Sequence, residues 1–214
     1  GYQMRKNRAN VIDIMLALDT SGSMQFEDYA VAGRKANRLD VAKDALRDFI
    51  NRRKANPSDR FGVDRIGLVL FAKYAWTQCP LTLDYGLFSH EVDEAKFASK
   101  EKDGTAIGSA IGLSVARLRD SEAKSKVIIL LTDGINNRGE LDPITAAGIA
   151  KQYGIRVYTI GAGSAEQGTT MVNGMIPVRR EPIDEDALRK IADTTGGKYY
   201  RAADTEQLLA AYAE

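Results

Sequence analysis

The fold of this chain is set by residues 11–24, Val11-Ile-Asp-Ile-Met-Leu-Ala-Leu-Asp19-Thr20-Ser21-Gly22-Ser23-Met24. The first eight residues are mostly aliphatic, which predicts a strand buried on both faces, as in a parallel sheet. The polar residues that follow stand at the carboxyl end of this strand, where an open α/β sheet places its ligands. Asp19, Ser21 and Ser23 offer oxygen atoms at alternate positions, and Gly22 allows the backbone to turn tightly.

Length and composition are those of an ordinary globular domain. The 214 residues are enough for one α/β domain with a substantial core. The 30 basic and 29 acidic residues give a net charge of +1, which argues against a general nucleic-acid binder. No apolar run reaches the roughly 18 residues needed to cross a bilayer, and the one cysteine, Cys79, excludes an intrachain disulfide. Because the chain begins with Gly1 rather than Met, we expect a fragment or a processed product of a longer protein.

Strand and helix patterns alternate along the rest of the chain, which predicts one open, doubly wound α/β sheet with helices on both faces. Further buried strands are expected at 65–71, 126–132, 156–160 and 198–201. A neighbouring antiparallel strand is expected over 74–78, ended by Pro80. Apolar stripes and capping residues predict helices at 38–55, 83–97, 107–118, 142–153, 184–195 and 204–213.

Three segments stand outside this alternation. Residues 1–10 are polar and basic, which predicts an extended lead-in before a single domain over 11–214. Residues 25–35 lack clear periodicity and are interpreted as a long loop beside the proposed site. Residues 170–178 predict a surface β-hairpin, because Asn173-Gly174 is typical of a type I′ turn between two strands.

The candidate functional residues follow or precede buried elements in three separate loops and all carry oxygen atoms: Asp19, Ser21, Ser23, Thr105 and Asp133. Strands that end at the same edge of a doubly wound sheet can bring these loops together. An all-oxygen set with waters in the remaining positions suits a hard cation such as Mg²⁺. Its two carboxylates supply at most −2 against +2 on the ion, so we expect an open position for an acidic side chain of a partner protein.

A purely structural interpretation is also available for each residue. Ser21 and Ser23 can be loop hydroxyls that bind the backbone, and Asp133 can begin a turn. This interpretation does not explain why such residues end neighbouring strands. The single histidine, His90, is expected on a solvated helix face, and Cys79 as a small buried hydrophobe rather than a reactive thiol.

These motifs resemble the metal-ion-dependent adhesion site of von Willebrand factor A (VWA) domains, in matching order from about residue 11 to 213. The matching segments are Asp-Thr-Ser-Gly-Ser at 19–23, Gly-Thr-Ala at 104–106 and Leu-Thr-Asp-Gly at 131–134. The resemblance implies a Rossmann-like, mostly parallel sheet with one short antiparallel edge strand. It also implies that Ser21 and Ser23 bind the metal directly, while Thr105 and the two aspartates alternate between direct and water-mediated contact. Mg²⁺ is the expected ion, with Ca²⁺ or Mn²⁺ as alternatives.

Three further stretches resemble the bacterial aerotolerance (BatA-like) branch of this family: Thr77-Gln-Cys-Pro-Leu-Thr-Leu-Asp84-Tyr85, residues 124–137 and Thr195-Gly-Gly-Lys-Tyr. Membership of that branch implies a parent protein anchored in the bacterial inner membrane, with the domain in the periplasm. It also implies partners among other VWA or tetratricopeptide-repeat (TPR) proteins and a MoxR-type ATPase system.

The leading functional hypothesis is therefore a non-enzymatic, divalent-metal-dependent module for protein–protein interaction. The alternative is an aspartyl-phosphate-type phosphatase with Asp19 as nucleophile at the end of a strand. That mechanism needs a second acid two residues later, where this chain has Ser21, and no catalytic lysine can be placed.

Overall fold

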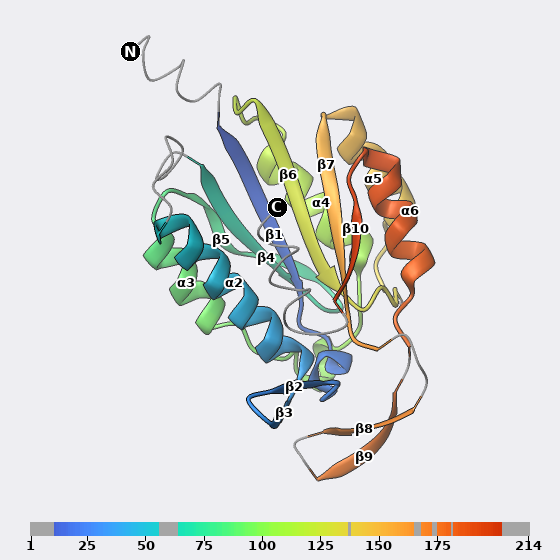
Figure 1. The fold of residues 1–214 in the computed structure, drawn as a ribbon. Helices are drawn as coiled ribbons and strands as arrows, with labels where there is room; N and C mark the ends of the chain where they lie inside the picture. Colours follow the sequence, from blue (N-terminus) through green and yellow to red (C-terminus); the bar gives the residue numbers. More distant parts are fainter. Residues whose placement is uncertain are drawn as a thin grey trace.

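A six-stranded sheet forms the middle layer of the computed structural model, which describes residues 11–55, 64–136, 138–164, 168–172, 175–180 and 182–202 (Figure 1). The strand order is β10-β7-β6-β1-β4-β5. In chain order the strands are β1 (Ile12–Asp19), β4 (Arg65–Phe71), β5 (Ala75–Thr82), β6 (Ser125–Thr132), β7 (Ile155–Ala162) and β10 (Tyr199–Ala202). Neighbouring strands are parallel except for β4 and β5. The predicted doubly wound, mostly parallel sheet with an antiparallel edge strand is confirmed.

The central strand is β1, which lies between β4 and β6. From β1 the chain continues to β4 and β5 on one side before it crosses to β6 on the other. The strand order therefore reverses at β1, the place where open α/β sheets bind ligands. Leu18 of β1 pairs with Leu131 of β6, so the polar residues that follow the two strands leave the sheet at the same edge.

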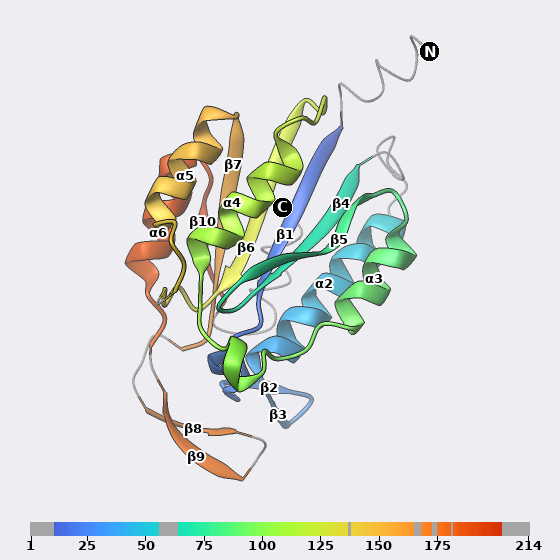
Figure 2. The same ribbon diagram turned by 180° about the vertical axis from the view of Figure 1, so that it is seen from behind.

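Helices cover both faces of the sheet. Within the described residues they are α2 (Arg38–Ala55), α3 (Tyr85–Asp93), α4 (Ile107–Leu118), α5 (Pro143–Gln152) and α6 (Glu185–Thr195). In Figure 1, α2 and α3 lie in front of the sheet, and Figure 2 shows α4 and α5 in front of the opposite face.

The two cores explain why β1 is aliphatic at nearly every position. Ile14 and Leu16 pack into the core on the side of α2 and α3, while Met15 and Ala17 pack into the core on the other side. Successive side chains of a strand point to opposite faces, so a strand between two helical layers needs apolar residues on both.

Several predicted helix boundaries are confirmed and have clear local causes. The Asp142 carboxylate accepts hydrogen bonds from the backbone N–H groups of Ile144 and Thr145, which fixes the start of α5. Asp184 does the same for α6 through the N–H of Ala187. Gly196 ends α6 at φ +75°, a left-handed conformation that glycine adopts without steric cost.

The prediction that Pro80 ends the edge strand is wrong. β5 continues to Thr82, and its pairing with β4 shifts register around Cys79, so Pro80 lies at an irregularity. Proline is tolerated in an edge strand because its missing N–H leaves no partner strand unsatisfied. Pro80 is exposed, as this explanation requires.

The long loop predicted at residues 25–35 is also a wrong prediction. A 3-10 turn over Gly22–Gln25 leads into a short hairpin of β2 (Tyr29–Val31) and β3 (Arg34–Ala36). Its two turn residues, Ala32 and Gly33, have φ values of +52° and +77°. A type I′ hairpin turn requires positive φ at both positions. The sequence did not indicate this turn because alanine, at position 32, rarely adopts positive φ.

Helix α3 is shorter than the predicted 83–97. The Asp84 carboxylate accepts a hydrogen bond from the N–H of Leu87 and sets the start of the helix. Its buried side chains are Tyr85, Phe88 and Val92, whereas Leu87 is 41% exposed. His90 is exposed on this helix, as predicted.

A second hairpin, β8 (Gly168–Val172) with β9 (Ile176–Arg180), confirms the excursion predicted at 170–178. Its turn residues Asn173 and Gly174 lie outside the described residues, as do the predicted lead-in at 1–10 and the predicted terminal helix at 204–213. Among the helices that the structure describes, none combines the length and apolarity required to cross a membrane.

Candidate metal centre

Asp19 ends β1 and is completely buried. One carboxylate oxygen accepts a hydrogen bond from the backbone N–H of Ser21 at 2.8 Å. The other accepts the hydroxyl of Thr132, the last residue of β6, also at 2.8 Å. These bonds fix the carboxylate between the ends of two parallel strands.

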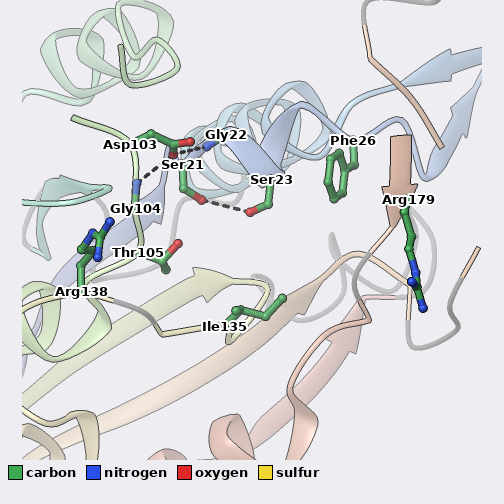
Figure 3. Close-up of a pocket in the computed structure, with 10 residues that line it drawn as sticks. All are labelled: Ser21, Gly22, Ser23, Phe26, Asp103, Gly104, Thr105, Ile135, Arg138 and Arg179. Atoms are coloured by element: carbon green, nitrogen blue, oxygen red, sulfur yellow. Dashed lines mark hydrogen bonds between the residues drawn. The ribbon is translucent and has the colours of Figure 1, made fainter. Parts of the chain in front are cut away.

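The two serine hydroxyls lie side by side in the turn after β1. The Oγ atoms of Ser21 and Ser23 are 3.1 Å apart (Figure 3), and Ser23 donates to a carboxylate oxygen of Asp133 at 2.5 Å. Since a hydroxyl has a single proton, the Ser21 hydroxyl is the donor to Ser23. The 3-10 turn, closed by a bond from the N–H of Met24 to the carbonyl of Ser21, keeps both hydroxyls on the same side.

Asp133 follows β6 and is also completely buried. Its second carboxylate oxygen accepts the N–H of Ile135 at 3.1 Å, and its backbone carbonyl accepts the N–H of Asp184 at 2.9 Å. Gly134 has φ +82°, and a Cβ there would lie 2.7 Å from the Asp184 carbonyl oxygen. The close approach of this loop to the start of α6 therefore requires glycine.

Thr105 reaches the same place from the loop before α4 and is 4% exposed. Its backbone carbonyl accepts the N–H of Arg138 at 3.1 Å. The neighbouring Asp103 accepts the N–H groups of Gly22, at 2.7 Å, and Gly104, at 2.8 Å, so it ties the serine turn to the threonine loop (Figure 3). This loop-joining role of Asp103 was not predicted from the sequence.

These loops enclose an open pocket of about 360 Å³. Ser21, Ser23 and Thr105 line it, while the two aspartates are buried and joined to the serine turn by hydrogen bonds. The structure thus brings the predicted site residues to one edge of the sheet. Cys79 and His90 lie elsewhere, on β5 and α3, and burial raises the pKa of the Cys79 thiol to about 11, as expected for an unreactive cysteine.

The electrostatics of the pocket floor favour a cation. Burial, together with the nearby charge of Asp133, raises the pKa of Asp19 to about 7, and its hydrogen bonds to Ser21 and Thr132 oppose the rise. Two buried carboxylates that repel each other are both stabilised by a divalent ion between them.

The donor set also fits a hard metal ion. It consists of carboxylate and hydroxyl oxygens, which suit Mg²⁺, Ca²⁺ or Mn²⁺. Within the described part of the chain, no three side chains of His, Cys, Asp or Glu gather closely enough to hold a metal ion. The described residues that line this pocket include no histidine or cysteine, the ligands typical of zinc sites.

Arg38 is a further residue of the site that was not predicted. It is 1% exposed at the start of α2, and its guanidinium pairs with Asp28 and, at 3.4 Å, with Asp133. The guanidinium also lies 4.9 Å from the centre of the Phe26 ring. The helical spacing could have indicated that Arg38 is buried, because it lies one turn before the buried residue Ala42.

The model of the von Willebrand factor type A domain matches residues 13–214. The chain belongs to this family. An uncharacterized protein of Borreliella burgdorferi is 32% identical to this VWA domain over 90% of the chain and 54% of that protein. A UPF0353 protein of Mycobacterium leprae (strain TN) is 30% identical over 97% of the chain and 59% of that protein. The VWA domain therefore spans between half and two thirds of the length of these relatives.

Solved structures support the family and the aerotolerance-related branch. An aerotolerance-related membrane protein of Bacteroides fragilis has a TM-score of 0.73 at 27% identity, covering 92% of this VWA domain and 94% of that chain. The conserved hypothetical protein BatB of Bacteroides thetaiotaomicron has a TM-score of 0.74 at 27% identity, with coverages of 94% and 96%. The VWA domain of SpRpn10, at 16% identity and a TM-score of 0.64, shares the fold.

Replacing Arg38 with methionine tests the buried ion pairs of the VWA domain. Arg38→Met leaves Asp28 and Asp133 without their buried cation, so we expect the free energy of unfolding in urea to fall by about 3–5 kcal/mol. Arg38→Met/Asp28→Asn removes one of the uncompensated charges and should regain part of the loss. A change below about 0.5 kcal/mol in the single variant, as at an ordinary surface site, would contradict this assignment.

Proposed function

We propose that this VWA domain is a non-enzymatic protein-interaction module that works through a divalent metal ion. Asp19, Ser21, Ser23, Thr105 and Asp133 hold the ion, Mg²⁺ or alternatively Ca²⁺ or Mn²⁺, and a partner protein adds an acidic side chain. The proposal rests on how charge is distributed at the site. Uncharged hydroxyls line an open pocket, and two carboxylates that repel each other are buried next to these hydroxyls.

In this arrangement a bound metal ion would be able to accept a carboxylate from another protein as a further ligand. The two carboxylates proposed as metal ligands, Asp19 and Asp133, are buried, and Arg38 partly offsets the charge of Asp133. An ion held by the hydroxyls would present its charge to the open side of the pocket, where a carboxylate is the natural hard ligand.

The setting that we propose is the bacterial cell envelope. The similarity to a protein described as an aerotolerance-related membrane protein supports a membrane-anchored parent. In the same proposal, this domain lies on the periplasmic side of the inner membrane. Candidate partners are other VWA or TPR proteins and a MoxR-type ATPase system. The alternative, a phosphatase that uses Asp19, gains no support, because the position of its second acid is occupied by Ser21.

Metal binding is tested by thermal unfolding. Mg²⁺ at about a hundred times its Kd should stabilise the folded domain by about 2.7 kcal/mol, which raises the Tm by about 5–10 °C for a domain of this size. Asp19→Ala and Ser21→Ala should lose this increase because each removes a proposed ligand. The matched control is Ser125→Ala, at the amino end of β6, opposite the site. An Asp19→Ala variant with the same Mg²⁺-dependent increase as Ser125→Ala would contradict the proposed ligands.

Partner binding is tested with the full-length parent protein. Tandem-affinity purification from membranes in Mg²⁺ should recover a partner that is absent when EDTA replaces Mg²⁺. The same partner should be lost from the Asp19→Ala variant and retained by Ser125→Ala. Recovery that is equal in Mg²⁺ and in EDTA would show that the interaction does not use the metal.

A further inference from the structure

Two exposed arginines line opposite sides of the pocket. Arg138 belongs to the loop after β6, and Arg179 belongs to β9 of the second hairpin. In Figure 3, Arg138 lies beside Thr105, while Arg179 lies on the far side of Ser21 and Ser23. Neither arginine pairs with a carboxylate within the described ranges of the chain.

The side chain of Arg138 is held in position by its neighbours. Its backbone N–H donates to the carbonyl of Thr105, and its aliphatic stem lies against Gly104. A Cβ on Gly104 would lie 2.6 Å from Cγ of Arg138, and the φ of +145° at Gly104 also favours glycine. Because Gly104 has no side chain, the aliphatic part of Arg138 packs beside Thr105, a proposed metal ligand. The charged group of Arg138 faces solvent.

Arg179 belongs to a hairpin that projects from the edge of the sheet at which the proposed metal ligands lie. Figures 1 and 2 show β8 and β9 beyond this edge, away from both helical layers. The two strands contact chiefly each other, and Met175 and Ile176 are 79% and 56% exposed. An isolated two-stranded hairpin is only marginally stable. Contact with a bound molecule would therefore stabilise the β8–β9 hairpin.

The charge around the pocket favours an anion. Among the lining residues that the structure describes, Asp103 is the single carboxylate, and it already accepts the N–H groups of Gly22 and Gly104. Nearby Asp28 is paired with Arg38. The two lining arginines therefore give the described part of the wall a positive balance before any metal is counted.

We propose that the pocket binds an acidic segment of a partner protein with three carboxylates, one for the metal and one each for Arg138 and Arg179. Arginine binds a carboxylate through two parallel N–H donors, which selects its position as well as its charge. The metal-bound carboxylate belongs to the proposed function above, whereas recognition by the arginines and the β8–β9 hairpin is a separate claim. The hairpin would thereby distinguish one acidic partner from another.

The test uses two fluorescent peptides with blocked ends, Glu-Gly-Asp-Gly-Glu and Ser-Gly-Asp-Gly-Ser, titrated with the domain in Mg²⁺ and in EDTA. The first peptide should bind about fivefold more tightly, because two exposed ion pairs, each weak by itself, add to the affinity. Arg138→Glu/Arg179→Glu should abolish this difference, while a Mg²⁺-dependent increase in Tm should remain, because the proposed metal ligands are intact. The matched control is Arg156→Glu, an exposed arginine near the amino end of β7. Raising the salt concentration should also reduce the difference between the peptides.

The outcomes separate this inference from the proposed function. Equal binding of the two peptides, a double variant that behaves like Arg156→Glu, or no binding of the acidic peptide up to about 1 mM would overturn the role of the arginines. Binding that depends on the arginines but is the same in EDTA would overturn the metal-dependent function alone. If the double variant instead loses binding to phosphatidylserine vesicles, with no preference between the peptides, the arginines would serve a membrane surface and the inference would fail.

Discussion

The structure depends on two carboxylates that are buried close together at the ends of neighbouring parallel strands. Asp19 and Asp133 repel each other, and their charges are offset by hydroxyl donors and by the Arg38 guanidinium. Such an arrangement is costly unless the charges are compensated. The serine turn, Thr132 at the end of β6 and the first turn of α2 all contribute to this compensation. The same constraint explains why these loops converge and why the resulting pocket is suited to a cation.

The sequence predicted the parts of the molecule that depend on local patterns. Runs such as residues 127–131 are apolar at successive positions, which is typical of strands covered on both faces. Aspartates at helix starts and Gly196 at a helix end set boundaries within one or two residues. The candidate ligands could also be predicted, because each one stands at a strand end or beside a glycine turn. Parallel strands then brought them to the same edge.

The features that were missed depend on tertiary contacts that no local pattern records. A buried arginine is rare, and Arg38 is identified by its partners Asp28 and Asp133 rather than by its neighbours in sequence. Asp103 joins loops that are 81 residues apart. Pro80 is compatible with β5 because β5 is an edge strand, a fact that follows from sheet order alone. In each case the sequence gives the chemistry of the residue, and the fold decides what that chemistry contacts.

The central claim is that oxygen atoms from three loops hold one divalent ion. Anomalous diffraction from crystals of this domain grown with Mn²⁺ tests it most directly, because the ion itself is located. The account predicts the strongest anomalous peak in the pocket, within coordination distance of the Ser21 and Ser23 hydroxyls and close to Thr105, Asp19 and Asp133. An empty pocket at saturating Mn²⁺, or a strongest peak elsewhere on the domain, would contradict it.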